Sequence, residues 1–193
     1  MSVKSSNPGT GRHALGSKSS ETMNSSGQMK RVAPTIVADG GTRLCRKVGI
    51  VFGKRKKAVN GASRLRGLAF FEGFSDAELD RVAELADDVE IEAGELLIDQ
   101  GRVGQECYVI ESGQAEVFVG EDHLVTLGPG SMVGEMSLID RRPRTATVVA
   151  TTPMALLAFD TKAFQKLLSE MPKAEERVHT LLASRLKANL SDG

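Results

Sequence analysis

Residues 88–159 contain the feature that most restricts the fold, because their apolar runs are only four to eight residues long and each ends at a turn signal. Runs this short do not fill ordinary helices, whereas many short strands at close spacing are typical of an antiparallel sandwich or roll. Turn residues such as Gly94, Ser112-Gly113 and Gly128-Pro129-Gly130 separate the runs. The predicted strands cover 89–92, 95–99, 106–111, 114–119, 123–127, 145–151 and 154–159.

A helix is predicted immediately before this strand-rich region. Ser75 and Glu78 have the spacing of a capping box, in which the serine hydroxyl accepts from the glutamate amide and the glutamate side chain reaches back. Apolar residues then recur at helical spacing, which predicts a helix over 75–87.

Helical periodicity returns after residue 160. Asp160 or Thr161 is suited to cap a helix that ends near Met171, and Pro172 is suited to the first turn of the next helix. We therefore expect an α+β fold that is mainly β, with an antiparallel β-roll or jelly-roll barrel. An N-terminal helix and two C-terminal helices would flank it.

Charge divides the chain into two unlike parts. Residues 1–66 contain 14 Lys and Arg but two acidic residues, whereas residues 67–193 contain 11 basic and 23 acidic residues. Residues 1–30 lack an apolar period and are expected to be disordered. We expect 1–64 to be a disordered or loosely ordered basic extension, with a weak strand or turn as the alternative over 31–66. Residues 65–193 are expected to form the folded domain.

The most informative segment for function runs from 127 to 148. Gly134 permits a tight turn from a strand into a very short helix that begins at Met136, whose free backbone amides suit an anion. Pro143 cannot continue that helix, so Arg144 is expected to enter a strand that returns toward it. A guanidinium at this position suits a phosphate, and Glu135 is placed to accept a hydrogen bond from a sugar hydroxyl.

This segment resembles the phosphate-binding cassette of the cyclic-nucleotide-binding domain family. The resemblance is carried by Gly134-Glu135, Met136-Ser137-Leu138 and Pro143-Arg144-Thr145-Ala146-Thr147-Val148, and by the spacing of Gly101, Gly104, Tyr108, Ile110, Gly113 and Val117. It covers about 65–190. Val133 departs from the pattern, because the family has an aromatic residue there, and we expect a change of packing without loss of the site.

The resemblance implies a binding site for a cyclic nucleotide. Glu135 would bind the ribose 2′-hydroxyl and Arg144 the cyclic phosphate. Further contacts would come from Gly134 and from the amides of Met136, Ser137, Thr145 and Ala146. In the family the purine packs under the last helix, so Leu182, Arg185, Leu186 and Asn189 are candidates for a purine lid. In the alternative interpretation, the leucines belong to the ordinary hydrophobic core, and Arg185 and Asn189 lie on a solvated face of the helix.

The resemblance also implies the class of ligand and of protein. We expect cAMP as the ligand ahead of cGMP, although a threonine at position 145 occurs in some cGMP binders. No cofactor, metal site or catalytic set is expected, so the chain is interpreted as a sensor and not as an enzyme. Cys45 and Cys107 are too few for a disulfide framework, and Cys107 is expected to be a buried thiol.

No secretory signal and no apolar stretch long enough to span a bilayer is present in the sequence, so a cytoplasmic protein is expected. Members of the family that activate transcription carry a DNA-reading domain after the long helix, where this chain ends, so no sequence-specific DNA binding is expected. The output would then lie in an effector protein.

An alternative function rests on the basic segment 43–66. Its charge would suit nucleic acid or an anionic membrane, with the nucleotide site degenerate or accessory. In a further alternative, the basic tail folds back on the acidic body of its own chain.

Overall fold

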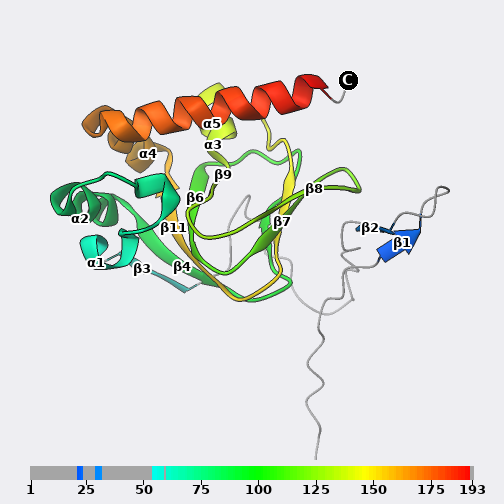
Figure 1. The fold of residues 1–193 in the computed structure, drawn as a ribbon, viewed down its shortest axis with the longest axis horizontal. Coiled ribbons are helices and arrows are strands. Elements are labelled where there is room, and N and C mark those ends of the chain that lie inside the picture. Colours follow the sequence, from blue (N-terminus) through cyan, green and yellow to red (C-terminus); the bar gives the residue numbers. More distant parts are fainter. Residues whose placement is uncertain (1–20, 24–28, 32–53, 59, 192–193) are drawn as a thin grey trace, which may run out of the picture.

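A computed structural model describes residues 21–23, 29–31, 54–58 and 60–191 of the chain (Figure 1). Two antiparallel sheets form the body, with strand orders β5-β10-β7-β8 and β3-β4-β11-β6-β9. The strands are β3 (Lys54–Lys57), β4 (Asp87–Ile91), β5 (Leu96–Ile98), β6 (Glu106–Ser112), β7 (Ala115–Val119), β8 (Asp122–Leu127), β9 (Met132–Val133), β10 (Thr147–Ala150) and β11 (Met154–Asp160). The predicted antiparallel roll is confirmed, and all seven predicted strands are present.

The helices pack on one face of the β3-β4-β11-β6-β9 sheet. They are α1 (Gly61–Leu65), the 3-10 turn η1 (Ala69–Phe71), α2 (Asp76–Leu85), α3 (Glu135–Asp140), α4 (Thr161–Glu170) and α5 (Pro172–Ser191). The periodicity predicts three of them, α2, α4 and α5. The capping box at Ser75 and Glu78 is formed in both directions, and Asp160 caps α4 by accepting from the amide of Ala163. Helix α3 begins at Glu135, one residue before the predicted start.

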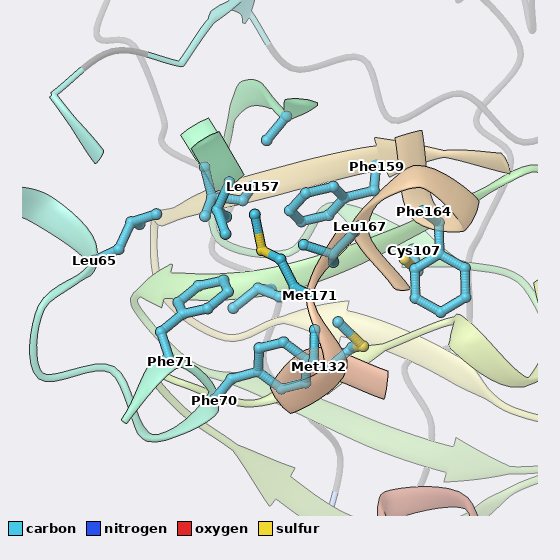
Figure 2. Packing of buried hydrophobic residues seen from close by; sticks show 14 of the residues in the cluster. Leu65, Phe70, Phe71, Cys107, Met132, Leu157, Phe159, Phe164, Leu167 and Met171 are labelled. Carbon is cyan, nitrogen blue, oxygen red and sulfur yellow. The ribbon is translucent and has the colours of Figure 1, made fainter. Parts of the chain in front are cut away.

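Strands β6 and β11 are buried on both faces, which explains why they are continuous apolar runs. On one face, Cys107 and Phe159 pack with the helices; on the other, Tyr108 and Leu156 pack inside the roll. The helical cluster is shown in Figure 2, where Phe70, Phe71, Phe164, Leu167 and Met171 surround the sheet face. The β3-β4-β11-β6-β9 sheet therefore separates two cores: an outer core between this sheet and the helices, and an inner core between the two sheets. Helix α5 packs on the outer core.

The ordered body begins before the expected boundary at Leu65. Strand β3 pairs with β4 in antiparallel register, and α1 packs on α2. Within the segment expected to be disordered, β1 (Glu21–Met23) pairs with β2 (Met29–Arg31). The remainder of residues 1–53, which the expectation of disorder also covered, lies outside the described residues.

Candidate functional site

The cassette segment forms a tight connection between β9 and α3. Gly134 has φ 85° and ψ 0°, a left-handed conformation that glycine adopts without steric cost. A Cβ at this position would lie 2.5 Å from Nη1 of Arg144 and 3.1 Å from the carbonyl oxygen of Glu106. Both the turn and the nearby guanidinium therefore require glycine at position 134.

Arg144 is a buried cation held by neutral acceptors. Its side chain is 8% exposed. Nη1 donates to the carbonyl oxygen of Gly134 and to the hydroxyl of Ser137, both at 2.7 Å, and Nη2 donates to the carbonyl oxygen of Glu106 at 2.5 Å. The backbone is fixed too, because the Arg144 amide donates to Arg102 and its carbonyl accepts from Gly101. Both ends of the residue are thus held in place.

The positive charge of Arg144 has no direct counter-ion in the described part of the chain. No carboxylate there lies within ion-pair distance of its guanidinium. Burial lowers the pKa of Arg144, and the more distant Tyr108, Cys107, Glu106 and Glu135 oppose that effect. A guanidinium stays protonated in proteins regardless, so a buried cation remains that an anion would stabilise.

Glu135 lies at the first position of α3 and is fully buried, with 0% of its surface exposed. Its Oε1 pairs with Nη1 of Arg185 at 2.5 Å. Its Oε2 is buried without a hydrogen-bond partner among the described residues. A buried carboxylate oxygen without a donor costs free energy, so this atom is a ready acceptor for a hydroxyl group.

The last helix is joined to this carboxylate. Arg185 also donates from Nη2 to the carbonyl oxygen of Met132 at 2.7 Å, which fixes the guanidinium against β9. Figure 1 shows α5 running past α3 along one end of the roll. Of the other lid candidates, Leu182 packs against the outer core and Leu186 is 52% exposed. The side chain of Asn189 lies outside the described residues.

The remaining predicted site residues lie around the same turn. Ser137 is buried and donates to the Gly134 carbonyl oxygen at 3.0 Å, while Met136 is half-buried. Thr145 is exposed, and Ala146 packs against the inner core. Val133, which stands where the family has an aromatic residue, is 3% exposed and packs inside the roll.

Three contributors to the site were not predicted as such. The carbonyl oxygens of Glu106 and Met132 accept from the two arginines, and Gly104 lies against the Arg144 guanidinium. Every residue type has a backbone carbonyl, so the sequence does not show which carbonyl oxygens accept these hydrogen bonds. Gly104 did belong to the glycine spacing that carries the resemblance, which was the available signal.

Cys107 is a free thiol with 0% exposure, as predicted. Burial raises its pKa well above the ordinary value, and the negative charge of Glu135 adds to that effect. Among the described side chains, no group of three or more His, Cys, Asp or Glu is arranged to hold a metal ion. None of the described helices combines the length and apolar character that a bilayer crossing requires.

The basic segment is described only from Lys54 onward. There, β3 runs against β4 with Lys56 opposite Asp88 and Lys57 opposite Asp87, and Lys57 pairs with Asp87 at 2.8 Å. Half of 43–66, on which the alternative of nucleic-acid or membrane binding rests, lies outside the described residues, namely 43–53 and 59. In the described part, Lys57 is directed at the acidic body of its own chain.

Taken together, the site offers one buried cation, one buried acceptor oxygen and a short turn between them. This combination suits a small ligand with an anionic group close to a hydroxyl.

Comparison with known proteins identifies the family to which this site belongs. Residues 88–171 match the family model described as the cyclic nucleotide-binding domain. The match includes β4 to α4 and the whole cassette, and it ends before α5.

Part of the chain is also similar to proteins with established names. A cAMP-dependent protein kinase regulatory subunit from Schizosaccharomyces pombe is 40% identical over 89 residues, which is 46% of this chain and 22% of the relative. The structure of the Thermus thermophilus catabolite activator protein superposes with a TM-score of 0.59 at 32% identity, over 63% of this chain and 60% of that one. A cAMP-binding acyltransferase from Mycobacterium smegmatis superposes with a TM-score of 0.55 at 31% identity, over 66% and 41%.

The chain thus spans 22% of the S. pombe relative, and about three-fifths of the Thermus structure. By its fold, its cassette and its family match, this chain contains a cyclic nucleotide-binding domain over residues 88–171.

Proposed function

We propose that this chain is a sensor that binds cAMP in preference to cGMP, with Arg144 on the cyclic phosphate and Glu135 on the ribose. The observation that carries the proposal is the pairing of a buried guanidinium without a carboxylate and a buried carboxylate oxygen without a donor. A cyclic nucleotide supplies one negative charge and one adjacent hydroxyl, which together satisfy both groups.

The phosphate would bind at Arg144. Three of its five N–H donors are used by neutral acceptors among the described residues, namely Gly134, Ser137 and Glu106. A phosphate oxygen forms a stronger charge-assisted bond than a carbonyl or a hydroxyl does, so the ligand competes favourably for the guanidinium. The amides of Met136, Ser137, Thr145 and Ala146 are the further contacts we propose.

The ribose would bind at Glu135. With Oε1 held by Arg185, Oε2 is left to accept from the 2′-hydroxyl. Arg185 thereby joins the lid helix α5 to the sugar site, and Leu182, Leu186 and Asn189 are proposed to approach the purine. Gly134 belongs to the site through its turn.

The preference for cAMP is supported by the relatives, which are named a cAMP-dependent protein kinase regulatory subunit and a cAMP-binding acyltransferase. The exposed hydroxyl of Thr145 is the feature that would favour guanine instead. We propose that the domain itself is not catalytic. Its output lies in an effector, as the name of the kinase regulatory subunit suggests for that relative.

Isothermal titration with matched ligands tests these assignments separately. We expect cAMP to bind with a dissociation constant of about 10 µM, given about 22 ligand atoms at roughly −0.3 kcal/mol each. 2′-Deoxy-cAMP should bind about tenfold more weakly to the wild type, but as well as cAMP to Glu135→Ala, which has no side-chain acceptor for the hydroxyl. Equal binding of both ligands to the wild type would contradict the role of Glu135, and tighter binding of cGMP would reverse the preference.

A further inference from the structure

We infer that Gly104 is a positioning residue for Arg144, and that glycine is required there by the guanidinium and not by the backbone. This inference rests on the proposed function, since it explains how the phosphate-binding cation is kept in place. A Cβ built on Gly104 would lie 2.0 Å from both Cζ and Nε of Arg144, and 2.3 Å from Nη2. These three atoms span the plane of the guanidinium, which therefore lies directly against the Gly104 backbone.

The backbone of Gly104 does not itself demand glycine. Eight described glycines have positive φ, and Gly104 is not among them. Gly67 is the reverse case, because its φ is +95° and a Cβ there would meet nothing within 4 Å. An alanine at Gly67 therefore has enough space but a strained backbone conformation. An alanine at Gly104 would instead collide with the Arg144 side chain.

The collision at Gly104 displaces the guanidinium more readily than it disrupts the fold. The atoms that it meets are the end of a flexible side chain, which must move by roughly 1.4 Å to reach ordinary van der Waals contact. A shift of that size breaks hydrogen bonds of 2.5 to 2.7 Å to Glu106, Gly134 and Ser137. The backbone on either side stays in place, because the amide and carbonyl of Arg144 are held by Arg102 and Gly101.

The test compares Gly104→Ala with Gly67→Ala on the full chain by titration with cAMP, by thermal melting and by ¹⁵N NMR. In titrations with cAMP, Gly104→Ala should weaken binding by about 30-fold or more, as loss of the guanidinium would. Gly67→Ala should bind like the wild type but melt a few degrees lower, because an alanine with positive φ is strained. In the ligand-free protein, the Arg144 Nε–H signal in ¹⁵N NMR, assigned with Arg144→Lys, should shift in Gly104→Ala and stay in place in Gly67→Ala.

The titration and the NMR signal together distinguish failure of this inference from failure of the proposed function. If the wild type binds cAMP and Gly104→Ala binds equally well with an unmoved Nε–H signal, the inference is wrong and the proposed function stands. If the wild type binds no cyclic nucleotide, the proposed function fails. The NMR signal alone then shows whether Gly104 positions the Arg144 guanidinium. A shift in Gly104→Ala then supports the positioning role, and an unmoved signal overturns it.

Discussion

Nη1 of Arg185 lies 2.5 Å from Oε1 of Glu135, although 50 residues separate them in the chain. One partner is fully buried at the start of α3, and the other extends from the last helix of the fold. Any movement of α5 therefore alters the surroundings of the carboxylate that we propose binds the ribose. A ligand at this carboxylate would in turn favour one position of α5, because such coupling is reciprocal.

Replacing Arg185 by Ala should destabilise the protein by about 2–3 kcal/mol, because it leaves the buried Glu135 charge unpaired. We also expect cAMP to bind about tenfold more weakly, since the carboxylate loses its orientation. Urea unfolding and titration would measure the two effects. The matched variant is Glu135→Gln with Arg185→Ala, which removes both charges and should recover most of the stability. If the double variant is as unstable as the sum of the single variants, the pair is not coupled.

Arg64 should be a far larger contributor to stability than its neighbour Arg66. Arg64 on α1 donates to Asp88 and to Glu111 with both edges of its guanidinium, at 2.6 to 3.0 Å, and all three side chains are less than one-third exposed. Arg64→Ala should reduce the free energy of unfolding by about 2–3 kcal/mol. Arg66 pairs with Asp76 at the surface, where both are about two-thirds exposed, so Arg66→Ala should cost less than about 1 kcal/mol. Equal losses in denaturant unfolding would contradict this ranking.

Acid should weaken the start of α2 through Glu78. Its hydrogen bonds from the Ser75 amide and hydroxyl, followed by Lys173, lower the pKa of Glu78 to about 2. A carboxyl whose folded pKa lies below its ordinary value of 4.5 stabilises the fold above that pH, and this contribution is lost as the pH falls toward 2. Melting temperatures between pH 5 and pH 2 should fall more for the wild type than for Glu78→Gln, which keeps a capping side chain without the titration. If the melting temperatures of the wild type and Glu78→Gln fall equally with pH, ionised Glu78 does not stabilise the start of α2.

The sequence predicts best what depends on local spacing. The capping box at Ser75, the cap at Asp160 and the strand-turn alternation are all formed as predicted, because each depends on residues within one turn or one hairpin. The cassette was recognisable because Gly134 and Arg144 lie only ten residues apart. Strand β9 was missed, since two residues are too few to show a period.

Contacts between distant segments were the part that the sequence could not provide. The position of Gly104 against Arg144, and the pairing of β3 with β4, join residues about 30 to 40 positions apart. Arg185 was a lid candidate by resemblance, but its bond to Glu135 depends on where α5 crosses the roll. Local periodicity carries no information on such crossings, which are decided by the packing of the two cores.

The most direct test of the account is isothermal titration of cAMP into Arg144→Ala, with Arg142→Ala as the matched control. Arg142 is exposed two residues away, so its loss changes the net charge equally without touching the buried site. We predict that Arg144→Ala weakens binding by about 2–5 kcal/mol while Arg142→Ala stays within about threefold of the wild type. Equal binding by the folded Arg144→Ala variant would contradict the claim that this guanidinium binds the cyclic phosphate.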